Sequence, residues 1–302
     1  MSLTVVVLLC GLTAAILAFG LSASRRLPVD PVDPALAQQA IRRSILRHPR
    51  VRRFLRERLD RHTAGGFLLT ASFVVVFVVA IVVGQLLTMI HERSWLANAD
   101  RSVASWGSKN GTSTTVHILT WITQLGSTIG ITIALSLTAA IDYYRRRNAE
   151  VFAFVATVGL GQVVLSNVLK RVVARPRPVV LHLVAASGYS FPSGHTVAAA
   201  ACMSAIALVF GAGRSRRVRA VLAGAAASIA ISVATSRALL GVHWLSDVLA
   251  GLFIGWGWFT VVAIAFGGRA QRLGDPVSDH PQGAAQVVIT PAPSTPSASA
   301  GG

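Results

Sequence analysis

The sequence predicts an all-α protein, a polytopic bundle of membrane-spanning helices. Of its 302 residues, 53% are hydrophobic and only 13% are charged, whereas an ordinary soluble domain has about 25% charged residues. Long apolar segments recur along the chain, and about 20 apolar residues are enough to cross the hydrocarbon core as a helix. Arginines gather in the short connections between these segments. Since a single segment satisfies its own backbone hydrogen bonds in lipid only as a helix, each segment is expected to be helical.

The first apolar segment covers residues 3–24 and is long enough to span a membrane. A cleaved signal peptide is the alternative interpretation. It fits poorly, because no basic residue precedes the apolar stretch and Arg25 and Arg26 follow it. We therefore expect residues 1–24 to form a retained N-terminal transmembrane helix.

Residues 25–65 form a basic segment, predicted to be cytoplasmic and next to the membrane. Over residues 25–62 there are 11 arginines and 4 acidic residues. After a proline-rich entry, apolar residues recur at helical spacing among the arginines. Two short amphipathic helices on an anionic leaflet would satisfy both faces. A solvated charged linker is an equally good interpretation.

Six more apolar segments follow, at about 66–90, 115–142, 150–169, 196–212, 220–236 and 248–267. We expect residues 66–267 to form one domain with a six-helix core, to which the helix at 1–24 is an addition. Residues 268–302 are rich in proline, serine, alanine and glycine, and are predicted to be a disordered tail.

The arginines also predict the orientation of the chain. With seven spans, the basic segment 25–62, Arg145–Arg147, the loop 213–219 and the start of the tail all lie on one side, expected to be the cytoplasmic side of a plasma (inner) membrane. The net charge of +17 then reflects topology, so no nucleic-acid partner is expected. The loops 91–114, 170–195 and 237–247 face outward. In the first of these, Trp95 and Trp106 flank Asp100 and are expected to lie at the membrane interface.

Two clusters of polar residues lie in the second outward loop. Lys170 and Arg177 stand at a membrane boundary, and these residue types grip phosphate oxygens, although snorkelling side chains at a helix end would look the same. Pro192-Ser193-Gly194-His195 directly precedes a helix, whose N-terminus attracts anions. Ser193 suits an N-cap, Gly194 allows close backbone approach, and His195 can protonate a leaving oxygen. An ordinary capped helix would explain Ser193 and Gly194 but not His195.

The third cluster is Ser236-Arg237 with His243 and Asp247. A histidine and an aspartate four residues apart lie on one helix face, where the carboxylate fixes the tautomer and raises the nucleophilicity of the other ring nitrogen. A structural His–Asp pair is the plainer interpretation. Arg237 adds another phosphate-binding group.

Taken together, the three clusters place two histidines, one aspartate and three cations on the same side of one bundle. Such groups suit the charge that develops on a transferred phosphoryl group. The sequence shows no carboxylate cluster for a divalent metal, and Cys10 and Cys202 lie in apolar segments. No metal and no cofactor are therefore expected. These residues alone do not decide which histidine is the nucleophile, although the Asp247 spacing favours His243.

The three clusters resemble the signature of the type 2 phosphatidic acid phosphatase (PAP2) superfamily, whose pattern is K-x6-R-P, P-S-G-H and S-R-x5-H-x3-D. Every motif position is met without substitution, from Lys170 to Asp247. The resemblance implies that His243 attacks phosphorus to form a phosphohistidine, that Asp247 orients it, and that His195 acts as acid and then base. It also implies that the phosphoryl oxygens are bound by Lys170, Arg177, Ser193, Gly194 and Arg237.

The expected function is that of a metal-independent phosphatase of a lipid phosphate or diphosphate, with its site on the outer face. By family analogy undecaprenyl diphosphate is the first candidate substrate, and phosphatidate and phosphatidylglycerophosphate are close alternatives. A lipid phosphotransferase using the same site is the second interpretation. A transporter or scaffold with a phosphate pocket but no turnover is the third, which the intact catalytic residues disfavour.

Overall fold

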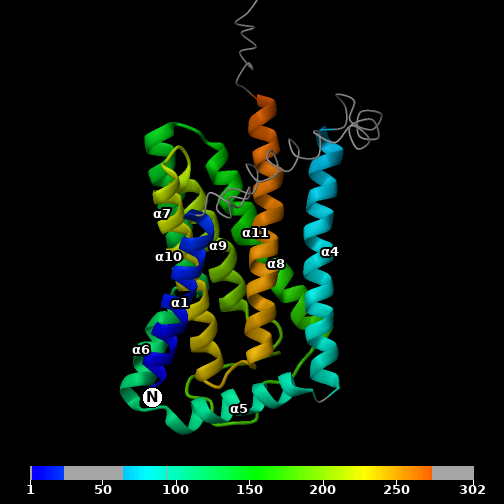
Figure 1. Ribbon diagram of the computed structural model, residues 1–302, viewed down its shortest axis with the longest axis vertical. Helices are drawn as coiled ribbons and strands as arrows, with labels where there is room; N and C mark the ends of the chain where they lie inside the picture. Colours follow the sequence, from blue (N-terminus) through cyan, green and yellow to red (C-terminus); the bar gives the residue numbers. More distant parts are fainter. Residues whose placement is uncertain (1, 24–63, 93, 274–302) are drawn as a thin grey trace, which may run out of the picture.

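The computed structural model describes residues 2–23, 64–92 and 94–273. The predictions for residues 25–63 of the basic segment and for residues 274–302 therefore concern parts of the chain outside the described residues. The described residues form nine helices (Figure 1). Their bounds are α1 Leu3–Ala23, α4 Ala64–His91, α5 Trp95–Asn110, α6 Ser113–Gln124, α7 Thr128–Arg146, α8 Glu150–Val173, α9 Gly194–Gly211, α10 Arg216–Leu239 and α11 Leu245–Leu273. The predicted all-α class is confirmed.

Helix α9 is the centre of the bundle and contacts α7, α8, α10 and α11. Beyond its first turn, the side chains of α9 are small or apolar on all of its faces. The run Thr196–Met203 is buried throughout, as expected of a helix with no polar face. Close approach of α11 fixes its first turns, because a Cβ on Gly255 would lie 2.6 Å from the Val197 carbonyl oxygen. The N-terminus of α9 is thereby held firmly against α11.

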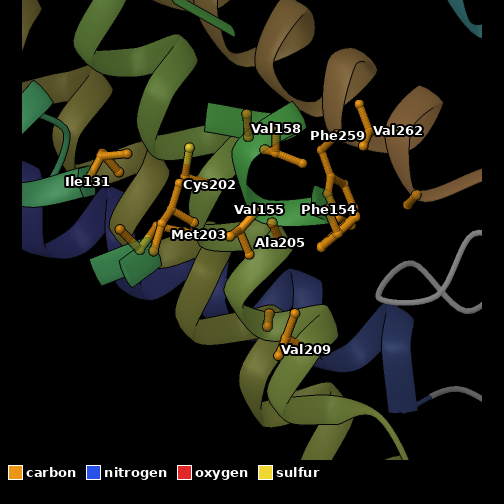
Figure 2. Close-up of a cluster of buried hydrophobic side chains, with 14 of the residues drawn as sticks. Ile131, Phe154, Val155, Val158, Cys202, Met203, Ala205, Val209, Phe259 and Val262 are labelled. Atoms are coloured by element: carbon orange, nitrogen blue, oxygen red, sulfur yellow. The ribbon is translucent and has the colours of Figure 1, made fainter. Parts of the chain in front are cut away.

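The largest buried cluster among the described residues joins α7, α8, α10 and α11 to the middle of α9. Figure 2 shows Ile131 of α7, Phe154 and Val158 of α8, Met203 of α9 and Phe259 of α11 gathered in this cluster. These side chains are 9% exposed or less. In a membrane, helices associate through close van der Waals packing and not through removal of apolar surface from water, so this tightly packed cluster ties the helices together away from the polar clusters.

Residues 115–142 do not form the single straight helix that was predicted. Helices α6 and α7 meet at a bend of 43°. The first helix ends at Gln124. Ser127 caps the second helix, since its hydroxyl oxygen accepts a hydrogen bond from Gly130 N. Gly126 packs so closely that a Cβ there would lie 2.6 Å from the His195 carbonyl oxygen. The bend therefore results from capping and from contact with the start of α9, which hydropathy does not report.

Among the described residues, six helices are long and apolar enough to span a membrane, and the bent pair supplies a seventh crossing. That pair crosses the bundle as one broken span. Helix α6 follows α5 at one end of the bundle. Helix α7 ends at the other end, where the Arg146 guanidinium donates to the Ala212 carbonyl oxygen. The chain is therefore a multi-pass membrane protein. The C-terminus of α7 and the connection from α9 to α10 lie at this end, opposite α5 (Figure 1). Arg145–Arg147 belong to the first of these segments and Arg214 to the second.

Residues 91–114 contain helix α5 rather than an extended loop. It lies across one end of the bundle (Figure 1), with Leu96, Asp100, Ala104 and Gly107 on its buried face. Ser94 caps its N-terminus by accepting from Leu96 N, and a Cβ on Gly107 would lie 2.3 Å from the Leu239 carbonyl oxygen. We call this end of the bundle, formed by α5 and the segments 174–193 and 240–244, the α5 end.

Helix α11 also departs from the prediction, because it runs to Leu273 instead of ending at 267. Residues 269–273 read Arg-Ala-Gln-Arg-Leu, and all of these residue types favour helix. The loss of hydrophobicity marks where the apolar span ends, not where the helix ends.

Helix α1 packs along α10 through small residues. A Cβ on Gly11 would lie 2.4 Å from Ser232 Oγ, and one on Gly224 would lie 2.9 Å from the Ala15 carbonyl oxygen. At the α5 end, Leu3 and Val7 are fully buried against Leu240 and Val242. Helix α1 is therefore packed into the bundle, and the retention of residues 3–24 stays a prediction.

Replacing Gly11 by leucine should push α1 away from α10 and lower stability by about 1–3 kcal/mol, as overpacking does. The matched control is Gly20→Leu on the same helix, since a Cβ on Gly20 would meet nothing within 4 Å. Thermal unfolding of the purified protein in detergent measures both variants. Equal melting temperatures for the two variants would contradict a tightly docked α1.

Candidate active site

The predicted site residues converge on one cavity at the α5 end. Its volume is 390 Å³, and it is lined by Lys170, Arg177, Ala185, Ala186, Ser187, Gly194, His195, Arg237 and His243. Six of the eight predicted site residues are therefore on its wall. The other two, Ser193 and Asp247, are fully buried behind it. The lining contains one lysine and two arginines, and none of its described residues is acidic.

Lys170 and Arg177 reach the cavity because α8 ends between them. The helix stops at Val173, where Ala174 adopts a left-handed conformation and its N–H donates to the Lys170 carbonyl oxygen. Pro176 then prevents the helix from continuing. Lys170 Nζ comes close to the start of α9, 3.8 Å from where a Cβ on Gly194 would lie. Gly194 therefore leaves open space between this ammonium group and the helix N-terminus.

Most of the Arg177 donors are already used by backbone carbonyl groups. Nε donates to Gly188 O at 3.0 Å, one terminal nitrogen donates to Ser187 O at 2.7 Å, and the other donates to Val242 O at 2.5 Å. Burial lowers the pKa of Arg177 below its ordinary value, but an arginine stays charged at neutral pH. Arg177 thus fastens the segment 185–188 over the cavity and contributes positive charge to it.

The start of α9 carries His195 on the cavity wall but turns Ser193 away from it. Ser193 occupies the N-cap position without the expected side-chain cap hydrogen bond. Its hydroxyl oxygen instead accepts from Thr196 Oγ1 at 3.0 Å, and its N–H donates to the Asp247 carbonyl oxygen at 3.3 Å. Ser193 does not line the cavity, because close packing of α11 on α9 encloses its side chain. Its role in phosphate binding stays a prediction.

Arg237 stands in the last turn of α10 and is 7% exposed. Its Nε is buried and has no hydrogen-bond partner among the described residues. A buried charge without a partner is costly, so this guanidinium group is suited to an anion that enters the cavity. Gly241 makes the turn after α10 with φ +74°, a conformation that favours glycine.

His243 lies in this turn and precedes α11, so it does not share a helix face with Asp247 as predicted. Its Nδ1 is 2.8 Å from the Ser190 carbonyl oxygen. A carbonyl oxygen only accepts, so Nδ1 carries the proton and Nε2 keeps its lone pair. Nε2 lies 3.4 Å from an Arg177 terminal nitrogen. Burial lowers the pKa of His243 to about 4, with Arg237 and Arg177 acting in the same direction and Asp247 opposing them.

Asp247 supports this histidine less directly than the sequence indicated. The Asp247 Oδ2 atom is 3.8 Å from His243 Nδ1, too far for a hydrogen bond. Asp247 Oδ2 accepts instead from Ser190 Oγ and from Trp244 N at 2.9 Å, the latter capping the start of α11. Ser190 thus joins the two residues, because its carbonyl oxygen accepts from His243 and its hydroxyl donates to Asp247.

The sequence did not indicate that three residues near the site, Asp100, Arg175 and Ser190, belong to the hydrogen-bond network around His243. Arg175 lies between Lys170 and Arg177 in sequence, but its side chain points away from the cavity and pairs with Asp100 and Asp247. A periodic signal was available for Asp100, since it shares a helical face with Leu96 and Ala104. Nothing local distinguishes Ser190 from other loop serines.

The chemistry of this cavity is that of a phosphate site. Three cations, a helix N-terminus and an imidazole with a free Nε2 surround a space in which the described lining has no negative charge. Fold and site together define a membrane-embedded enzyme of phosphate esters.

The comparisons with known proteins agree with this class. The family model described as PAP2 superfamily matches residues 150–270. Phosphatidylglycerophosphatase B of Bacillus subtilis is 32% identical over 145 residues, which cover 46% of this chain and 69% of that protein. Lipid A 1-phosphatase of Rhizobium etli is 36% identical over 124 residues, covering 38% of this chain and 47% of that protein. The chain belongs to the PAP2 superfamily.

A solved structure shows the same fold. The transmembrane PAP2-type phosphatidylglycerolphosphate phosphatase from Bacillus subtilis superposes with a TM-score of 0.57 and 26% sequence identity, over 66% of this chain and 96% of that one. The protein is therefore a phosphatase of the membrane. The domain boundaries expected at residues 66 and 267 stay predictions.

Proposed function

We propose that the protein is a metal-independent phosphatase of a lipid phosphate or diphosphate that works through a phosphohistidine on His243. The observation that carries the proposal is the cavity itself, in which three cations and two histidines surround a space without a described acidic lining residue. The buried, unpartnered Arg237 Nε supports it further. A phosphate group supplies the negative charge and the acceptor oxygens that this cavity calls for.

In the first step the lone pair of His243 Nε2 forms a bond to phosphorus while the bond from phosphorus to the leaving oxygen breaks. His195, which also lines the cavity, gives its proton to that oxygen. The imidazole becomes positively charged as the N–P bond forms. Its Nδ1–H keeps its hydrogen bond to the Ser190 carbonyl oxygen, and the Asp247 carboxylate at 3.8 Å stabilises the positive charge.

In the second step a water molecule attacks phosphorus, and the N–P bond breaks to return the electron pair to Nε2. His195, now neutral, takes the water proton. Lys170, Arg177 and Arg237 hold the phosphoryl oxygens in both steps, with the positive end of α9 behind Gly194. If a lipid or sugar hydroxyl replaces water, the same site acts as a phosphotransferase.

The substrate is inferred to be a lipid, because the cavity opens at one end of a bundle that lies in the membrane. Undecaprenyl diphosphate is the expectation from family analogy. A second candidate, phosphatidylglycerophosphate, is favoured by the likeness to phosphatidylglycerophosphatase B of Bacillus subtilis. We place the α5 end outside the cytoplasm of a plasma (inner) membrane, since Arg145–Arg147 and Arg214 lie at the opposite end and basic loops remain inside.

The test is a panel of lipid substrates given to the purified protein in detergent with EDTA present. Undecaprenyl diphosphate, phosphatidylglycerophosphate, phosphatidate and lipid A 1-phosphate are compared by release of inorganic phosphate. We expect one of them to be hydrolysed with EDTA changing the rate by less than about twofold, because cations of the protein replace Mg²⁺. Strong inhibition by EDTA, reversed by added Mg²⁺, would contradict the metal-independent mechanism. Transfer to an added alcohol without free phosphate would favour the phosphotransferase.

A further inference from the structure

We propose that Asp100 and Arg175 are positioning residues for the nucleophile, and that α5 is thereby a working part of the active site. The inference rests on the proposed role of His243. It concerns a buried polar network behind the cavity that connects four segments of the chain.

Arg175 forms the middle of this network. One terminal nitrogen of its guanidinium group donates to Asp247 Oδ1 at 2.6 Å, and the other donates to Asp100 Oδ2 at 2.8 Å. Both carboxylates are buried, at 1% exposure for Asp100 and 0% for Asp247. The guanidinium also lies over the Trp244 ring, 5.2 Å from its centroid. One cation therefore joins two buried carboxylates from different helices.

Asp100 brings α5 into the network. Its Oδ1 accepts from Ser246 N at 2.8 Å, and its Oδ2 accepts from Ser246 Oγ at 2.6 Å. Ser246 is the second residue of α11 and directly precedes Asp247. The Asp100 side chain thus accepts hydrogen bonds from the first turn of α11 and from the Arg175 guanidinium. It restrains Asp247 in two ways, through the neighbouring Ser246 and through Arg175.

The network reaches His243 through Ser190. The Ser190 N–H donates to the Arg175 carbonyl oxygen at 2.8 Å, and the Ser190 hydroxyl donates to Asp247 Oδ2. The Ser190 carbonyl oxygen then holds Nδ1 of His243 at 2.8 Å. Arg175, Ser190 and Asp247 form a closed ring of hydrogen bonds, and the only group of this ring that holds the imidazole is a backbone carbonyl. The position of Nε2 therefore depends on the ring as a whole.

Charge balance gives the network a second effect on the nucleophile. Arg175 lies between two carboxylates and does not line the cavity, so it neutralises Asp247 without competing for phosphate. Around the imidazole, Asp247 favours its protonated form, and burial, Arg237 and Arg177 oppose that form. Removal of Arg175 would leave Asp100 and Asp247 without a cation, and their combined charge would draw a proton to His243.

The experiment is a double-mutant cycle of Asp100→Asn and Arg175→Gln, with kcat, KM and the pH profile measured on the lipid hydrolysed in the panel. Outer partners of a functional histidine typically contribute 10–100-fold. We expect Arg175→Gln to lower kcat by about 100-fold and Asp100→Asn by about 10-fold. KM should stay within about threefold of wild type, because Lys170, Arg177 and Arg237 are unchanged. The acid limb of kcat/KM should move up by about one pH unit in Arg175→Gln, an effect that loss of structure alone does not produce.

The double variant should have a kcat at least about fivefold above that of Arg175→Gln, since it buries one unpaired carboxylate instead of two. Two exposed arginines next to the network, replaced as Arg171→Gln and Arg101→Gln, are the matched controls.

If Arg175→Gln does not fold, Asp100→Asn carries the test alone. Wild-type kcat in a stable Asp100→Asn, or strictly additive effects in the cycle, would overturn the inference. An inactive His243→Asn in the same assay shows that the proposed function itself still holds.

Discussion

His243→Asn is expected to lower phosphatase activity by about 10⁴-fold or more, the loss that follows removal of a covalent nucleophile. The asparagine keeps a polar group in the turn, but it has no ring nitrogen at the place of Nε2. Wild-type protein quenched during turnover of a ³²P-labelled lipid should carry label that is stable in alkali and lost in acid, as a phosphoramidate is. The variant should carry none.

His117→Asn is the matched control, because His117 is exposed on α6 and bonds only to Trp121 Nε1 among the described residues. It should retain wild-type activity. Full activity of His243→Asn would exclude this residue as the nucleophile. Label found on His195 instead would reverse the two assigned roles.

The pH dependence of the wild type gives an independent view of this residue. Because burial lowers the pKa of His243 to about 4, its Nε2 stays deprotonated in the free enzyme from neutral pH down to that value. Protonation of His243 should therefore reduce kcat/KM only as the pH falls towards 4, well below the ordinary histidine pKa of about 6.5.

His195→Asn is expected to reduce kcat by about 10²–10⁴-fold, the usual contribution of a general acid or base. The loss should depend on the leaving group. With a lipid alcohol the first step becomes slow, because the departing oxygen no longer receives a proton. With an aryl phosphate of low leaving-group pKa the first step should recover, and phosphoenzyme should then accumulate because water is not activated.

Rapid-quench measurement of the phosphoenzyme with the two leaving groups tests this second prediction. The phosphoenzyme level with the aryl phosphate should be clearly higher in His195→Asn than in wild type and in His117→Asn. An equal loss with both leaving groups, and no accumulation with either, would show that His195 only binds phosphate and transfers no proton.

Much of the site was predictable because its chemistry is carried by local sequence. Lys170, Arg177, Gly194, His195, Arg237 and His243 all line the cavity, and each belongs to a short polar cluster at the edge of an apolar segment. The helix at 196–212 and its neighbours followed from hydropathy in the same way. The hydropathy of one contiguous segment is enough to predict that it spans the membrane, without information about the rest of the chain.

The structure differs from the sequence-based expectation where a residue's position depends on distant contacts. Ser193 has the composition of an N-cap that faces the ligand, but Gly251 and Gly255 bring α11 so close that the hydroxyl is enclosed. The spacing of His243 and Asp247 indicated one helix face, yet α11 begins at Leu245 between them. The break in the segment 115–142 depends on contact between Gly126 and the backbone of His195.

The sequence by itself determined the class of the protein, its approximate spans and the residues of the cavity, because hydrophobicity and motif spacing are properties of contiguous stretches. Only the tertiary structure decided how the nucleophile is held. The Arg175–Asp100 pair joins residues 75 positions apart, and the Ser246–Asp100 hydrogen bond joins residues 146 positions apart. Hydrogen bonds need heavy atoms about 3 Å apart. Helix packing sets that distance between segments far apart in the chain, and no local sequence pattern of either segment indicates which residues will meet.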